Sequence, residues 1–255
     1  MKIARYSLGT ETFWGVLDGD DLHRLAGAPW DGTERTVARD SLSDARLLAP
    51  VTAPRIFGVG LNYVAHIAES GMKTPEVPLL FMKPSTTVIG PEAPIVYPRE
   101  AQNVHYECEL AVVIGKTARR LRPEQALDHV LGYTCANDVS ERVIQKAEMD
   151  QGALLVSKGY DTFCPVGPVI VTDLDPASIA IGTRVNGVGK QASNTSDLLF
   201  SVADLVTYLS TAITLVPGDL IITGTPSGVG PLVPGDEVEI FAEGIGVLRN
   251  PVVAE

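Results

Sequence analysis

The segment from His105 to Gly115, HYECELAVVIG, constrains the fold more than any other part of the chain. Its β-branched and apolar residues run to a closing glycine, which is typical of a buried β-strand. Successive side chains of a strand point to opposite faces, so we expect His105, Glu107 and Glu109 on one face and apolar residues on the other. The segment therefore predicts two carboxylates, roughly 6–7 Å apart, at the head of a buried strand.

Two poorly solvated carboxylates repel each other, and a bound divalent cation would relieve that repulsion. A solvated edge of the sheet would relieve it as well. A second predicted strand, over 131–136, leads into Asp138, which adds a third carboxylate or caps the helix that follows. Three oxygen ligands without a CxxC or HxH pair suit Mg²⁺ or Mn²⁺ rather than Zn²⁺. Arg142 and Lys158 would then supply positive charge near the same place, unless they lie in solvent.

His66 and Glu69 form a candidate catalytic pair on a helix that we expect to be capped by Asn62 and to end at Gly71. Residues three apart share one face of a helix. A carboxylate partner raises the basicity of a histidine and fixes its tautomer, as a general base requires. A surface pair near the end of a helix is the alternative interpretation.

Short strands dominate the rest of the chain, and the few predicted helices do not alternate regularly with them. This pattern favours a strand-dominated α+β class over a doubly wound sheet. Residues 1–50 predict a small β-rich module, and prolines at positions 50 and 54 mark its boundary with a larger domain over 51–255. The predicted helices cover Pro123–Val130, Val139–Met149 and Ser201–Thr211.

The formal net charge of −11 argues against nucleic acid or an anionic membrane as the main partner, because both require a basic surface. An anionic substrate would need a local cluster of cations. Cys108, Cys135 and Cys164 lie in runs of apolar or small residues without zinc spacing, so we expect reduced core residues. The chain has no apolar leader and no apolar run of about 18 residues, so a cytoplasmic location is expected.

Six segments, in order, resemble the fumarylacetoacetate hydrolase superfamily, and together they cover about residues 55–252. They are Gly60–His66, Phe81–Ser85, His105–Leu110, Asn137–Arg142, Lys158–Phe163 and Pro217–Pro226. The resemblance implies a mixed β-sandwich roll assembled as a homodimer, with the short N-terminal module of the smaller members. Where many similar sequences carry Gly-Gln-Trp, this chain has Gly152 followed by Ala153 and Leu154.

The same resemblance implies roles for individual residues. It implies an Mg²⁺ or Mn²⁺ site and a water-activating pair on a helix that acts as a lid, together with Lys158 as a further catalytic residue. Similar proteins contact their substrate, or hold water near the metal, at several other matching positions. The implied metal ligands are Glu107, Glu109 and Asp138, the pair is His66 and Glu69, and the substrate-binding residues are Lys83, Arg142, Gln145 and Thr225.

The expected activity is hydrolysis of a C–C bond in acylpyruvates and other 2,4-dioxo acids, through a metal-stabilised pyruvate enolate, within aromatic catabolism. The same site would serve an isomerase or decarboxylase of 2-hydroxy-diene-dioates in homoprotocatechuate breakdown, or an oxaloacetate decarboxylase. A non-catalytic binder of 2-oxo acids is a further alternative, although a binder needs no base such as His66. A cupin-like metal site using His105, Glu107 and Glu109 is the last, and no second histidine lies near it.

Overall fold

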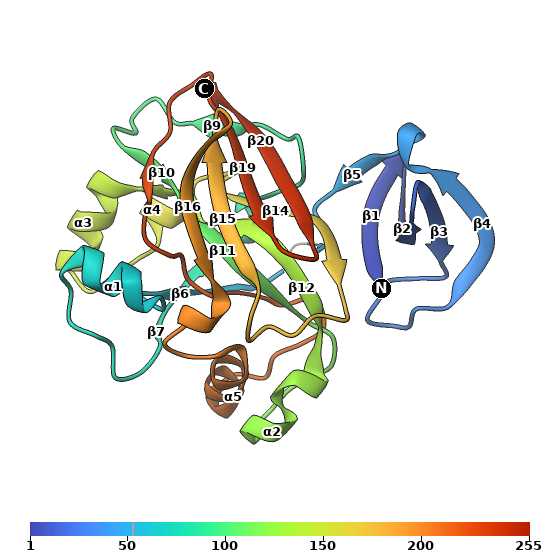
Figure 1. Ribbon diagram of the computed structural model, residues 1–255, viewed down its shortest axis with the longest axis horizontal. Helices are drawn as coiled ribbons and strands as arrows, with labels where there is room; N and C mark the ends of the chain where they lie inside the picture. Colours follow the sequence, from blue (N-terminus) through green and yellow to red (C-terminus); the bar gives the residue numbers. More distant parts are fainter. Residues whose placement is uncertain (53) are drawn as a thin grey trace.

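One 12-stranded sheet runs through most of the protein in the computed structural model, which describes residues 1–52 and 54–255 (Figure 1). Its strands follow the order β4-β3-β2-β1-β14-β12-β11-β17-β6-β7, with β5 paired to β1 and β8 paired to β14. The N-terminal strands are β1 (Lys2–Leu8), β2 (Glu11–Asp18), β3 (Asp21–Leu25), β4 (Arg35–Ser41) and β5 (Arg46–Leu48). The others are β6 (Ile56–Gly60), β7 (Leu79–Lys83), β8 (Val88–Ile89), β11 (Cys108–Ile114), β12 (Val130–Asn137), β14 (Cys164–Val171) and β17 (Leu220–Ile222).

The N-terminal strands form a lobe beside the rest of the molecule, drawn in blue in Figure 1. Strand β1 pairs with β14 through Lys2↔Val171 and Ile3↔Ile170, so the backbone ladder is continuous between the lobe and the larger part. The division of the chain into domains 1–50 and 51–255 stays a prediction.

A five-stranded sheet with the order β16-β15-β19-β20-β9 covers one face of the central strands. Its strands are β9 (Ile95–Tyr97), β15 (Ala180–Val185), β16 (Val188–Asn194), β19 (Glu237–Ala242) and β20 (Gly246–Ala254). Strand β11 is buried along its whole length. Leu110 and Val112 point into the core between the two sheets, and Ala111 and Val113 belong to a second core on the opposite face. The strand-dominated α+β class is confirmed.

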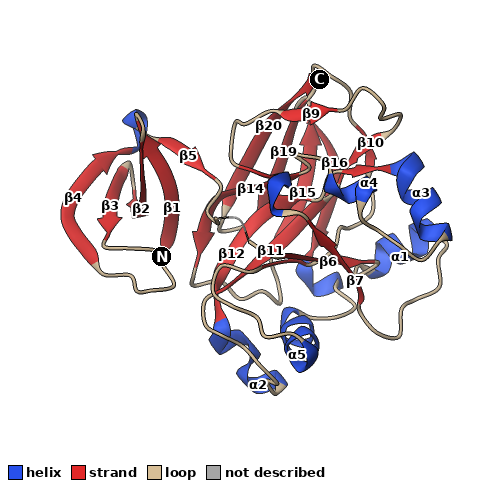
Figure 2. Cartoon of the chain, turned by 180° about the vertical axis from the view of Figure 1, so that it is seen from behind, coloured by secondary structure: helices blue, strands red, loops and turns tan. Residues whose placement is uncertain are grey.

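Three helices gather at the end of the large sheet that lies away from the N-terminal lobe, as both views show (Figures 1 and 2). They are α1 (Val64–Ser70), α3 (Arg142–Asp150) and α4 (Val156–Gly159). Helices α2 (Pro123–Ala126) and α5 (Val202–Ala212) pack together elsewhere on the molecule. Within residues 1–52 and 54–255, no helix is long and apolar enough to cross a membrane.

The single strand predicted over residues 105–115 is instead two strands, separated at Glu107. The first, β10 (Val104–Tyr106), belongs to a three-stranded sheet with β13 (Ser140–Glu141) and β18 (Gly230–Pro231). The chain leaves the ladder at Glu107 because its N–H donates to the side-chain oxygen of Asn137, at 2.9 Å. The carbonyl of Glu107 accepts the N–H of Asp138.

The predicted start of the first helix is also corrected. Tyr63, not Asn62, is the N-cap residue of α1, while Gly71 ends the helix in the left-handed conformation as expected. The Asn62 side chain is buried and bonds to the backbone of Phe200 and Thr223, so it ties distant loops together instead of capping a helix. The three cysteines are free and buried, as predicted for core residues.

The close contact between β12 and β14 gives a test of the fold. A Cβ atom on Gly132 would lie 2.5 Å from the carbonyl oxygen of Val171 and 2.8 Å from Cγ2 of Ile170. We expect Gly132→Ala to lower the free energy of unfolding by about 1–3 kcal/mol, because backbone must shift to admit the methyl group. The matched control is Gly189→Ala in β16, where a Cβ atom meets nothing within 4 Å. Urea unfolding that shows equal stability for the two variants would contradict this packing.

Candidate metal centre and active site

Three buried carboxylates form a cluster at the end of β11. One oxygen of each of Glu107, Glu109 and Asp138 lies within 4.8 Å of the others, and the residues are 5%, 2% and 1% exposed. Strands β11 and β12 are antiparallel, with Cys108 opposite Asn137. This register places the residue after β12 beside the residues on either side of Cys108.

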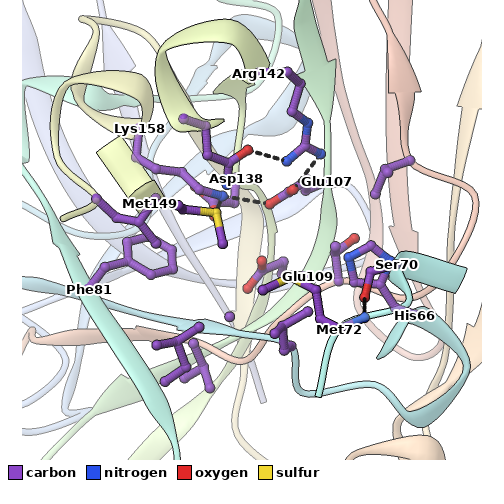
Figure 3. A pocket seen from close by; sticks show the side chains of 18 residues that line it. His66, Ser70, Met72, Phe81, Glu107, Glu109, Asp138, Arg142, Met149 and Lys158 are labelled. Carbon is purple, nitrogen blue, oxygen red and sulfur yellow. Dashed lines mark hydrogen bonds and ion pairs between the residues drawn. The ribbon is translucent and has the colours of Figure 1, made fainter. Parts of the chain in front are cut away.

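Three cations contact the cluster, each from a different element, and Figure 3 shows two of them, Arg142 and Lys158. The Lys158 ammonium, on α4, donates to Glu107 Oε2 at 2.7 Å and also to Asp138 Oδ2. The ammonium of Lys83, at the end of β7, donates to Asp138 Oδ1. The guanidinium of Arg142, at the start of α3, has Nη2 2.6 Å from Glu107 Oε1. Buried charges of opposite sign therefore compensate one another across the floor of the site.

These charges shift the pKa values of the two glutamates in opposite directions. Burial opposes ionisation of Glu107, but Arg142 and Lys158 outweigh it and hold the pKa of this carboxyl well below its ordinary value. Burial, with the charges of Asp138 and Glu107, raises the pKa of Glu109 well above its ordinary value. Burial would lower the pKa of Lys158, but the same two acids outweigh it and the pKa is raised.

Glu109 is the carboxylate that lacks a compensating charge. In the described part of the chain no cation pairs with it, and the N–H of Gly224 donates to its Oε2 at 2.6 Å. Three carboxylates without sulfur or imidazole form a donor set for a hard cation. The residues present therefore fit Mg²⁺ or Mn²⁺, held by oxygens of Glu107, Glu109 and Asp138.

His66 lines the same cavity as the acidic cluster. Its Nδ1 lies 3.0 Å from Glu69 Oε2, and Glu69 also accepts the N–H of Gly228 at 3.1 Å. An ionised carboxylate only accepts hydrogen bonds, so this contact places the proton of the neutral imidazole on Nδ1 and leaves Nε2 as the basic atom. The pairing predicted from the i,i+3 spacing is present in the structure.

The structure brings the sequence-predicted site residues to one cavity. Of these residues, Glu69 reaches it through His66 and Lys83 through Asp138, while the others line it directly. These others are His66, Glu107, Glu109, Asp138, Arg142, Gln145, Lys158 and Thr225. The catalytic, substrate-binding and metal-ligand roles assigned to these residues stay predictions.

His105, the histidine of the cupin-like alternative, does not line this cavity. Its Nε2 lies 3.0 Å from the side-chain oxygen of Asn103. Burial and the nearby charge of Arg142 lower its pKa to about 4. Because His105 lies outside the cavity and contacts Asn103, it is not placed to bind a metal held by the acidic cluster.

Sequence reasoning missed several residues that shape the site. No sequence feature assigns a role to the side chain of Asn137, whose oxygen accepts the backbone N–H of Glu107. Gln191, on β16, donates a hydrogen bond to Thr225 of the cavity wall, and no sequence motif marks it. The apolar wall of the cavity includes Met72, Phe81, Met149 and Leu154, and only the departure from Gly-Gln-Trp pointed to the last of these.

Two sequence profiles match the chain. The profile described as Fumarylacetoacetate (FAA) hydrolase C-terminal matches residues 55–253, and the one described as Rv2993c-like, N-terminal matches residues 1–50. The chain belongs to the fumarylacetoacetate hydrolase superfamily. The predicted resemblance and the predicted fold of this superfamily, with its small β-rich N-terminal module, are confirmed.

Solved structures of two isomerases resemble this superfamily member over its whole length. The 5-carboxymethyl-2-hydroxymuconate delta-isomerase from Mycobacterium smegmatis is 44% identical, with a TM-score of 0.93 and 100% coverage of both chains. The 2-hydroxyhepta-2,4-diene-1,7-dioate isomerase from Mycobacterium marinum is 42% identical, with a TM-score of 0.92 and coverage of 100% of this chain and 99% of that one.

Two further proteins bear on the chemistry. The mitochondrial oxaloacetate tautomerase fahd2 of Xenopus laevis is 40% identical over 246 residues, which are 92% of this chain and 76% of the tautomerase. The maleylpyruvate hydrolase from Sphingobium sp. SYK-6, solved with manganese(II) and pyruvate, is 33% identical. Its TM-score is 0.81, and the match covers 100% of this chain and 99% of that one.

The acidic cluster predicts a measurable metal affinity. We expect Asp138→Asn to weaken Mn²⁺ binding by more than about a hundredfold, because loss of an outer-sphere partner alone costs up to that factor. The matched control is Asp219→Asn, which also removes a buried carboxylate, but one that pairs with Arg55. Isothermal titration calorimetry on both variants would contradict the ligand set if they bound Mn²⁺ equally well.

The raised pKa of Glu109 predicts how the stability of the metal-free protein depends on pH. Below the ordinary pKa of 4.5 the carboxyl is protonated in both the folded and the unfolded chain. As the pH rises, the unfolded chain loses this proton first, so the group makes the metal-free fold progressively less stable. We therefore expect metal-free Glu109→Gln to be more stable than wild type at about pH 8, by a margin that shrinks towards pH 4.5.

Urea unfolding in the presence of a chelator, repeated across this pH range, measures the margin. Saturating Mn²⁺ is the control, and it should reverse the order of stability because only the wild type keeps all three carboxylates. A margin that does not change with pH would show that Glu109 is not held protonated by its surroundings.

Proposed function

We propose that this protein is a divalent-cation-dependent isomerase that moves a proton within 2-oxo or 2-hydroxy-dienoic acids, with oxaloacetate tautomerisation as the simplest case. The observation that carries the proposal is the cavity itself, which places the His66–Glu69 pair with three carboxylates and the cations Arg142 and Lys158. Relatives at 40–44% identity are named as isomerases or tautomerases, which favours isomerisation over hydrolysis as the proposed reaction.

The cationic residues and the His66–Glu69 pair have different roles in this proposed reaction. Arg142 and Lys158 attract and orient an anionic substrate in a protein whose net charge is −11. When bound, a divalent cation supplies positive charge that stabilises negative charge on the substrate oxygens. His66 removes a proton at Nε2 and returns it to another atom of the substrate. Glu69 holds the imidazole at Nδ1 and stabilises the imidazolium form between these two transfers.

Tautomerisation of oxaloacetate tests this function. We expect wild-type protein with Mg²⁺ or Mn²⁺ to speed the loss of the enol form, followed by its ultraviolet absorbance, and we expect a chelator to abolish the effect. His66→Gln should lower kcat about 10²–10⁴-fold, because it removes the general base. The control is His23→Gln, which changes a histidine of β3 in the N-terminal lobe.

Hydrolysis is the second candidate, favoured by the maleylpyruvate hydrolase relative and by the ability of the His66–Glu69 pair to activate water. Pyruvate release from an acylpyruvate, measured on the same preparations, separates the two. Rapid pyruvate release without enol turnover would contradict the isomerase and establish the hydrolase. The homodimer and the cytoplasmic location stay predictions.

A further inference from the structure

Gln191, a buried residue of β16, uses every hydrogen-bonding position of its side-chain amide. Its Oε1 accepts the backbone N–H of Cys108 at 3.0 Å and the hydroxyl of Thr183 at 2.7 Å. Its Nε2 donates to Oγ1 of Thr225 at 2.9 Å and to the carbonyl of Pro226 at 2.8 Å. One side chain therefore connects the backbone between Glu107 and Glu109 to the loop that carries Thr225.

The orientation of this amide is determined by its partners. A backbone N–H can only donate and a backbone carbonyl can only accept, so Cys108 must face the oxygen and Pro226 must face the nitrogen. Exchanging the two atoms would break both contacts. The second N–H of Gln191 consequently points at the oxygen of Thr225.

The hydrogen bond from Gln191 leaves the Thr225 hydroxyl to act as a donor. Its oxygen accepts from Gln191, so its own hydrogen needs a different acceptor. In residues 1–52 and 54–255, no side chain or carbonyl takes that hydrogen. Thr225 lines the same cavity as Glu109 and Lys158. The hydroxyl is thus free to donate to an oxygen of a ligand.

We propose that Gln191 is a positioning residue, which holds the Thr225 hydroxyl as a hydrogen-bond donor to a carboxylate or keto oxygen of the acid in the cavity. The proposal rests on the proposed function, since it takes a 2-oxo acid as the ligand. If Gln191 only supported the strands, its loss would cost the same whether or not position 225 carried a hydroxyl.

The test removes the amide in three backgrounds. Gln191→Met is made in the wild-type protein, in Thr225→Ser and in Thr225→Val. Serine keeps the hydroxyl at position 225, and valine removes it. The readouts are kcat/KM for oxaloacetate and the Kd of the Mn²⁺-loaded protein for oxalate, a planar dianion with the oxygens of a 2-oxo acid. We expect about a tenfold loss in the two backgrounds with a hydroxyl and less than a twofold loss with valine.

The control is Thr183→Val, which removes a hydrogen bond from the acceptor side of the same amide. We expect it to change the oxalate Kd less than twofold. Mn²⁺ affinity, measured by calorimetry, shows whether Glu107 and Glu109 keep their positions. If Gln191→Met does not fold, Gln191→Asn replaces it, because its amide is one methylene shorter and cannot reach both sides.

An equal loss in all three backgrounds would overturn the proposal, and so would an oxalate Kd that Thr225→Val leaves unchanged. A Mn²⁺-loaded wild type that does not bind oxalate would overturn it as well. A wild type that binds oxalate but does not turn over oxaloacetate would contradict the proposed isomerase alone, and the oxalate measurements would still decide the role of Gln191.

Discussion

The pairing of β11 with β12 is the constraint on which the site depends. Because β11 is packed on both faces, Glu109 is buried, and the register Cys108↔Asn137 brings Asp138 to the same place. Desolvation costs several kcal/mol for each buried ion unless charges or hydrogen bonds compensate it. The rest of the site can be understood as the compensation of three buried carboxylates.

That compensation comes from parts of the chain that are distant in sequence. Lys83, Arg142 and Lys158 belong to β7, α3 and α4, and they pair with Glu107 and Asp138, which leaves Glu109 to be compensated by a bound metal ion. A divalent cation would therefore leave the site with a net positive charge suited to a dianion. An acidic protein can bind an acidic ligand in this way, because the field inside the cavity has the opposite sign to the net charge of the molecule.

The periodicity of strands and helices predicts side-chain pairs that lie two or three residues apart in the sequence. Alternation predicted Glu107 and Glu109 on one face and i,i+3 spacing predicted His66 beside Glu69, and the structure brings each pair together. His105, predicted on the same face as the two glutamates, lies outside the cavity. The strand break at Glu107 could not be predicted, since the side chain of Asn137 on another strand causes it. Lys83 and Gln191 act through tertiary contacts. The family resemblance pointed to the lysine, whereas no sequence signal marked the glutamine.

The walls of the cavity bear on which reaction the site favours. Isomerisation requires that the proton taken by His66 return to the substrate, whereas hydrolysis requires an ordered water between the base and the carbonyl carbon. An ordered water needs two to four polar partners. Met72, Met149 and Leu154, which form an apolar part of the cavity wall, offer such a water no strong partner. An ordered water would have to take its partners from polar lining residues such as Arg142 and Thr225, which the proposals above assign to the substrate instead. We therefore infer that the proton passes between His66 and the substrate itself.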